Sequence, residues 1–116
     1  MNDTPQSRSI RKIVNAGNGS KSLLYNPFAK GVKRGTLVYD NRWYIYDQII
    51  LSRNMLSDIG LCRGNGAGNV KIAAVGIFAP HYLTDRRGFP LPTYRNGDYL
   101  GGVSDHLPVY VIVAAE

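Results

Sequence analysis

The sequence predicts an α+β fold built from one helix, about four strands and long loops. Only one segment, near the N-terminus, repeats its apolar residues at helical spacing, whereas the later apolar segments are short and rich in β-branched and aromatic residues. The 116 residues suffice for one domain at most. A hydrophobic share of 44% with 19% charged residues excludes a disordered chain, and no apolar run approaches the length of a transmembrane segment.

The predicted helix covers residues 5–15. Thr4 is a good N-cap, and Pro5 suits the first helical position because its ring already holds a helical φ angle. The apolar residues that follow at helical spacing are Ile10, Ile13 and Val14. So little helix would leave one face of a sheet poorly covered.

A hairpin is expected next. Its first strand covers residues 36–39, and its turn lies at Asp40 and Asn41, which tolerate positive φ angles. Residues 43–52 (WYIYDQIILS) are the strongest strand signal in the chain. Both of its alternating faces are largely apolar, which predicts a central strand. A short helical turn is expected at residues 54–59.

Two further strands are predicted at residues 70–78 and 107–115. The long loop between them, residues 79–102, holds four glycines and three prolines. Long ordered loops often carry function, so we expect binding residues there. The glycine-rich stretch at residues 63–68 lacks the Gly-Lys-Ser/Thr ending of a phosphate-binding loop.

The charge balance is strongly basic. Fourteen Lys and Arg residues against eight acidic ones give a net charge of +6 and a pI of about 9.7. This charge suits a polyanion such as nucleic acid and equally suits a soluble basic surface. The single cysteine, Cys62, excludes an intrachain disulfide and a CxxC metal site, and the single glutamate, Glu116, leaves no internal Glu for a mechanism.

Asp47 is out of place in its strand. It shares an alternating face with Trp43, Ile45 and Ile49, and an ionised carboxylate in apolar surroundings is costly unless it has a partner. A nearby arginine or backbone amides would satisfy it structurally. A histidine would satisfy it and make a catalytic pair.

Ser104, Asp105 and His106 follow a pair of glycines at the start of the last strand. Histidine is the natural acid–base residue at neutral pH, and a neighbouring carboxylate orients its ring. Asp105 could bind a metal ion or take a proton. Such a tripeptide also arises by chance, but Asp47 needs a partner and His106 needs an orienting group.

Two more regions are candidates. Asn2 and Asp3 precede the helix and, read alone, form a turn and a helix cap. In the long loop, aromatic and basic residues could stack on bases or hold phosphates, and the alternative is a solvated loop. They include Tyr94, Tyr99, Arg95, Arg86 and Arg87. His81 is expected to be structural or incidental.

Together these features resemble the C-terminal portion of the endonuclease/exonuclease/phosphatase superfamily, the DNase I-like and exonuclease III-like domains. Gly-Gly-Val-Ser-Asp-His-Leu-Pro-Val at residues 101–109 resembles the terminal signature of the family. Tyr-Asp-Gln-Ile-Ile-Leu-Ser at residues 46–52 resembles its aspartate-bearing strand. Asn-Asp-Thr-Pro at residues 2–5 resembles the end of its Gly-Asp-Phe-Asn-Asp-x-Pro motif.

The resemblance implies metal-assisted hydrolysis of a phosphoester, with Mg²⁺ or Mn²⁺ as cofactor. His106 would lie beside the scissile phosphate, and Asp47 would orient it. Asp105 would help bind the metal or position the attacking water, and Asn2 would contact the phosphate or the nucleophile. The substrate-binding residues would be Ser104, Tyr94, Tyr99 and Arg95. The substrate would be a phosphoester and could be a nucleic acid.

The family fold is a four-layer α/β/β/α sandwich of about twice this length. We therefore expect residues 1–116 to form one partial domain, the C-terminal half with mainly one antiparallel-rich sheet and one or two short helices. Met1 stands where the family motif has Phe, so a truncated, weakly active or inactive enzyme is expected. The alternatives are a non-catalytic basic nucleic-acid-binding module and a half-domain that assembles with a separately encoded N-terminal half.

Overall fold

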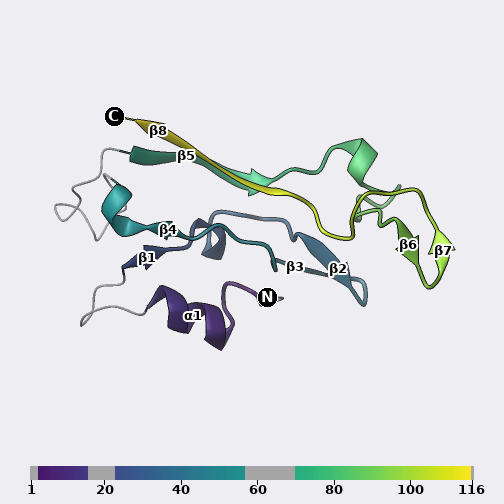
Figure 1. Ribbon diagram of the computed structural model, residues 1–116, viewed down its shortest axis with the longest axis horizontal. Helices are drawn as coiled ribbons and strands as arrows, with labels where there is room; N and C mark the ends of the chain where they lie inside the picture. The colour runs from purple at the N-terminus through teal and green to yellow at the C-terminus, as the bar shows by residue number, and fades with distance from the viewer. Residues whose placement is uncertain (1–2, 16–22, 57–69, 116) are drawn as a thin grey trace.

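A computed structural model describes residues 3–15, 23–56 and 70–115 (Figure 1). These residues form one α-helix, three 3₁₀ turns and eight strands, and all four strand pairs among them are antiparallel. The fold is therefore of the α+β kind that the sequence predicts. In the described part of the chain no helix is long and apolar enough to cross a membrane.

The helix α1 covers Arg8–Val14, three residues less at its start than predicted. Ser7 is the N-cap, and its Oγ accepts a hydrogen bond of 3.4 Å from the Ile10 N–H. Thr4 instead closes a turn before the helix, where its carbonyl accepts a hydrogen bond of 2.9 Å from the Ser7 N–H. Serine and threonine are both good N-caps, so residue type alone does not choose between them. Ile10 is buried, and α1 lies beside β1.

The hairpin of β2 (Leu37–Tyr39) and β3 (Arg42–Tyr44) forms as predicted. Its two turn residues, Asp40 and Asn41, have φ angles of 52° and 60°. Asp and Asn adopt this left-handed region more readily than other non-glycine residues, and such a two-residue turn matches the twist of paired strands.

The predicted strand over residues 43–52 is wrong as a single element. β3 ends at Tyr44, residues 45–50 pair with no strand among the described residues, and β4 (Leu51–Ser52) pairs with β1 (Leu24–Tyr25). Side-chain alternation shows which faces are apolar but not which backbone groups find a partner strand.

Three 3₁₀ turns join the strands. η1 (Pro27–Ala29) is capped by Asn26, whose Oδ1 accepts a hydrogen bond from the Phe28 N–H. η2 (Arg53–Met55) overlaps the start of the helical turn predicted at residues 54–59. Leu56 is extended rather than helical, and residues 57–59 lie outside the described residues. η4 (His81–Leu83) lies in the long loop.

The longest ladder pairs β5 (Val70–Ile77) with β8 (Val109–Ala115), close to the two strands predicted there. The loop between them contains a small hairpin that the sequence analysis missed, formed by β6 (Tyr94–Arg95) and β7 (Asp98–Tyr99). Its turn is Asn96-Gly97, with φ angles of 52° and 86°. Asn-Gly is a strong hairpin signal, but strands of two residues leave no alternating pattern around it.

The described strands form four two-stranded ladders rather than one continuous sheet. Two isolated bridges connect them, Leu56 with Val70 and Leu37 with His106. In Figure 1 the β5–β8 ladder runs along one edge of the molecule, α1 along the other, and β1 to β4 lie between them. Few apolar side chains of the described residues are fully buried. They are Phe28 in η1, Leu56 directly after η2 and Leu107 before β8.

Candidate functional site

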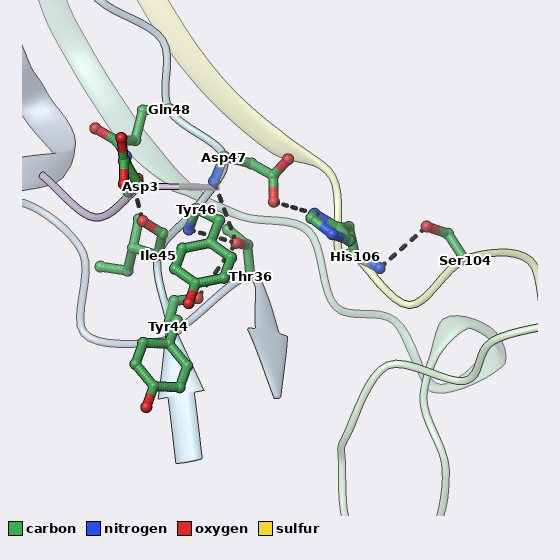
Figure 2. Close-up of polar contacts among 9 residues, drawn as sticks. All are labelled: Asp3, Thr36, Tyr44, Ile45, Tyr46, Asp47, Gln48, Ser104 and His106. Carbon is green, nitrogen blue, oxygen red and sulfur yellow. Dashed lines mark hydrogen bonds and ion pairs between the residues drawn. The ribbon is translucent and has the colours of Figure 1, made fainter. Parts of the chain in front are cut away.

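Asp47 and His106, which are 59 residues apart in the sequence, meet in the structure. The Nδ1 atom of His106 lies 2.6 Å from the Oδ2 atom of Asp47 (Figure 2). The side chain of His106 is 29% exposed and that of Asp47 is 37% exposed, so solvent and small ligands can reach the pair. The contact is a short hydrogen bond of the charge-assisted kind, with the imidazole donating to the carboxylate.

The backbone around His106 is fixed by the start of the β2–β3 hairpin. His106 forms an antiparallel bridge with Leu37, and the Leu107 N–H donates a hydrogen bond of 2.7 Å to the Thr36 carbonyl. Leu107 is 1% exposed, so the residue after the histidine is anchored in the core. These contacts hold the segment before β8 against β2.

The position of Asp47 depends on Thr36, which the sequence analysis did not single out. The fully buried Thr36 hydroxyl accepts hydrogen bonds from the N–H groups of Tyr46, at 3.1 Å, and Asp47, at 3.3 Å (Figure 2). It also lies 3.3 Å from the Tyr44 carbonyl, to which it donates. Thr36 therefore holds the chain on the Asp47 side with its side chain and on the His106 side with its carbonyl.

The residue after Asp47 is held by the N-terminal segment. Gln48 donates from Nε2 to the Asp3 carbonyl at 2.6 Å, and its Oε1 accepts a hydrogen bond of 2.7 Å from the buried Asn26. The carboxylate of Asp3 accepts a hydrogen bond from the Ser9 hydroxyl. Asp3, within the motif at residues 2–5, thus lies beside the motif that contains Asp47. Asn2 itself lies outside the described residues.

Ser104 and Asp105 make different contacts from their neighbour His106. The Ser104 hydroxyl accepts a hydrogen bond of 3.0 Å from the His106 N–H, so it stabilises the turn that presents the histidine. Asp105 is exposed and lines an open pocket of about 370 Å³, and His106 is not among the lining residues. The other polar residues around this pocket are Asp40, Asn41, Arg87 and Arg95.

A divalent cation would find part of its coordination shell here. Asp105, Asp40 and Asn41 offer the oxygen ligands that Mg²⁺ prefers. Within residues 3–15, 23–56 and 70–115, however, no three His, Cys, Asp or Glu side chains gather as metal ligands. Asp105, Asp40 and Asn41 are therefore candidate oxygen ligands at this pocket, and these described residues include only two acidic side chains.

The wall of this pocket is a loop fixed by Asp85. The Asp85 carboxylate accepts hydrogen bonds from the N–H groups of Arg87 and Phe89 and from the Arg87 guanidinium. Burial raises the pKa of Asp85, but these hydrogen bonds outweigh burial, so its pKa is lowered below the ordinary value. The Arg87 guanidinium also lies 4.4 Å from the centre of the Phe89 ring, and Phe89 meets Trp43 edge to face.

The last segment before Ser104 passes very close to the long loop. A Cβ atom at Gly102 would lie 1.9 Å from the Leu91 carbonyl oxygen, so only glycine fits there. The Gly102 carbonyl also accepts a hydrogen bond of 2.9 Å from the Thr93 hydroxyl. The glycines that precede the Ser-Asp-His tripeptide thus allow the loop and the site segment to lie against each other.

The remaining expected binding residues lie on the β6–β7 hairpin. Tyr94 and Tyr99 are directly paired across the two strands, with ring centres 5.4 Å apart, and both are strongly exposed. Arg95 reaches the pocket that Asp105 lines. His81 is exposed in η4, and its ring packs edge to face against Tyr82.

Comparison with known proteins bears on the whole of this arrangement. A family model described as the Endonuclease/Exonuclease/phosphatase family matches residues 1–115. The search of curated proteins and that of solved structures found no match. The match covers the segment around Asp3, the Asp47 strand and the Ser-Asp-His tripeptide.

Proposed function

From the premise that the chain belongs to the endonuclease/exonuclease/phosphatase family, we propose that it is a metal-dependent phosphoester hydrolase acting through Asp47 and His106. The family is typically hydrolytic. The observation that supports this proposal best is the 2.6 Å contact between the two side chains.

The contact suits acid–base chemistry at His106. Because the carboxylate of Asp47 accepts the Nδ1 proton, the neutral ring is held in the tautomer whose Nε2 atom is free. A free Nε2 can take a proton from water, and once protonated it can donate that proton to a phosphoryl oxygen. The partial exposure of the ring leaves room for a phosphoester beside it.

The family generally uses divalent metals, and we propose Mg²⁺ or Mn²⁺ as the cofactor here. When bound, the ion stabilises negative charge on the phosphoryl oxygens. Asp105 supplies one of its oxygen ligands in this proposal. Asn2 contacts the phosphate or the nucleophile, and Ser104 binds substrate while it supports the turn before His106.

We also propose that residues 1–116 act as one part of the four-layer family domain and assemble with an N-terminal half. Two observations support this. The radius of gyration is 16.6 Å, against about 13 Å for a compact chain of this length. The molecule is also only 17 Å thick along its shortest axis. A site completed by other elements of the domain would make this chain weakly active or inactive alone.

The test is turnover of a p-nitrophenyl phosphodiester and of nicked DNA, with Mg²⁺ and with chelator. We expect weak, Mg²⁺-dependent turnover that His106→Ala lowers to background, since general acid–base groups contribute about 10²–10⁴-fold. Asp47→Asn should cause a similar loss. His81→Ala is the matched control, because this exposed histidine belongs to η4 and packs against Tyr82 rather than against a carboxylate, and it should retain wild-type turnover.

Turnover that survives in the His106→Ala variant would contradict the assignment of this site. Robust turnover by the wild-type chain alone, abolished by His106→Ala, would contradict the proposal that the site is incomplete.

The second candidate function is a non-catalytic nucleic-acid-binding module, which the net charge of +6 favours. Its affinity for nucleic acid would fall steeply with salt and would not respond to Mg²⁺ or to Asp47→Asn. Binding of this kind with no turnover under any condition would favour it over the hydrolase.

A further inference from the structure

Strand β8 has an edge without a neighbouring strand. Among the described residues its one strand partner is β5, and the isolated bridges do not involve it. In Figure 1 the end of β8 near the C-terminus lies at the outside of the molecule. An unpaired edge presents a row of N–H and C=O groups with which another strand can pair.

Two hydrogen bonds show which residues of β8 face this edge. On the β5 side, the Pro108 carbonyl accepts a hydrogen bond of 2.8 Å from the Phe78 N–H. On the other side, the Leu107 N–H donates to the Thr36 carbonyl. The backbone groups of an antiparallel strand alternate between its two edges. The residues of β8 whose backbone groups point away from β5 are therefore Val109, Val111 and Val113.

β8 lacks the features that usually protect an edge strand. Natural edge strands carry charged side chains, a proline or a bulge, which discourage pairing with other chains. The seven residues of β8 (VYVIVAA) include no charged residue and no proline, and the register shift of the ladder lies in β5. Lys71 in β5 is the one charged residue of this ladder, so most of the net charge of +6 is carried elsewhere.

A strand that adds to this edge should be apolar on both faces. Tyr110 and Ile112 point to one face of β8 and are 40% and 52% exposed, while Val113 points to the other face and is 44% exposed. Apolar cross-strand neighbours would cover these side chains. β8 itself has this composition, and an antiparallel edge is complementary to a second copy of itself about a two-fold axis.

We infer that β8 pairs along this edge with β8 of a second copy of the chain, antiparallel and about a two-fold axis. Pairing over all seven residues places Ile112, the middle residue of β8, opposite Ile112 of the second copy. Val111 then exchanges backbone hydrogen bonds with Val113 of the second copy. The two ladders join into one sheet in the order β5–β8–β8–β5. This self-association goes beyond the proposed hydrolase and requires neither substrate nor metal.

Sedimentation velocity at increasing protein concentration measures the association. The wild-type chain should dimerise, and more strongly at high salt, because salt screens the repulsion between two copies of charge +6. Val111→Pro removes an N–H group that faces the free edge and leaves the hydrogen bonds to β5 in place. It should raise the dissociation constant of the dimer roughly tenfold or more, because both copies lose a hydrogen bond.

Ile77→Pro is the matched control. Ile77 pairs with Val109 and precedes Phe78, whose N–H points towards β8, so the N–H of Ile77 faces the opposite edge of β5. This variant should dimerise as the wild type does. An unchanged circular-dichroism signal from β-structure in both proline variants would show that the ladder itself is retained.

A disulfide cross-link tests the register independently of the proline variants. In a Cys62→Ser background, Ile112→Cys places two thiols at a directly opposed, non-hydrogen-bonded pair, where the Cα atoms lie about 4.5 Å apart. This variant should form a covalent dimer under mild oxidation. Val113→Cys also changes an exposed residue of β8, but its two copies are offset by two residues and exceed the reach of a disulfide, about 7 Å. It should give little covalent dimer.

Several outcomes would overturn the inference. One is a chain that stays monomeric at every concentration and salt. Equal dimerisation of Val111→Pro and wild type would place the contact away from this edge, and an equal loss in Ile77→Pro would place it on β5. Equal cross-linking of the two cysteine variants would indicate apolar association without register. A monomeric chain whose assembly with an N-terminal half is weakened by Val111→Pro would assign the edge to that half.

Discussion

At the scale of single residues, the candidate pair depends on a threonine that takes no part in the proposed chemistry. Thr36 holds Asp47 through its hydroxyl and the residue after His106 through its carbonyl. If β3 continued as a regular strand, Asp47 would point to the same face as Trp43. His106 pairs with Leu37, which also pairs with Tyr44, so its side chain lies on the opposite face. The departure from strand geometry at residues 45–50 is what allows the two side chains to meet.

We therefore predict that Thr36→Val weakens the contact between Asp47 and His106, although neither of these two side chains is changed. Valine has nearly the same shape but leaves the N–H groups of Tyr46 and Asp47 without their acceptor, which costs about 1–3 kcal/mol of unfolding free energy. The ¹⁵N shifts of the His106 ring, which report its tautomer, should change as well. Thr36→Ser keeps the hydroxyl and should restore the tautomer signature.

An unchanged His106 spectrum in a folded Thr36→Val variant would show that the threonine only stabilises the hairpin.

At the scale of elements, the 85–89 loop is built on one carboxylate. The pKa of Asp85 is lowered because its ionised form accepts hydrogen bonds from Arg87 and from the backbone, despite the opposing effect of burial. A group with a lowered folded pKa stabilises the fold above its unfolded pKa, and this contribution is lost as the pH falls through the folded value. The loop should therefore loosen in acid.

We predict that the wild-type chain loses stability as the pH falls below about 4, the ordinary Asp range. Asp85→Asn should be less stable at neutral pH by about 1–3 kcal/mol, the usual cost of losing a charged hydrogen-bond partner. It should also lose less stability than the wild type on acidification, as measured by denaturant unfolding at several pH values. Asp98→Asn, on the exposed hairpin, is the control. The same acid response in Asp85→Asn and wild type would remove Asp85 from this role.

At the scale of the whole molecule, the β5–β8 ladder keeps apolar side chains exposed on both faces. Ile112 and Val113 are neighbours in β8, so they point to opposite faces, and both are more than two-fifths exposed. An antiparallel sheet usually packs at least one of its two faces against a hydrophobic core. The ladder is thus suited to the interior of a thicker structure, as in the layered family domain that we propose.

We predict that the chain alone binds a hydrophobic dye such as ANS, and that adding the N-terminal half of the same family domain reduces the dye signal and raises the Tm. Ile112→Lys should leave the chain alone nearly as stable, within about 0.5 kcal/mol for an exposed position, but should block this assembly. Val103→Lys, which changes a more exposed residue in a loop outside the ladder, should not block assembly. Assembly that Ile112→Lys leaves intact would place the contact elsewhere.

The sequence by itself determined the local features of this protein. The Asp-Asn turn, the strands of the β5–β8 ladder and the family membership follow from residue types at fixed spacings, which act over a few residues. The tertiary structure decided what depends on distant partners. These features are the end of β3 at Tyr44, the hydroxyl of Thr36 as an acceptor, and the placement of Asp105, but not His106, at the pocket. These depend on where backbone N–H groups find acceptors across more than ten residues of chain, and no local pattern records that choice.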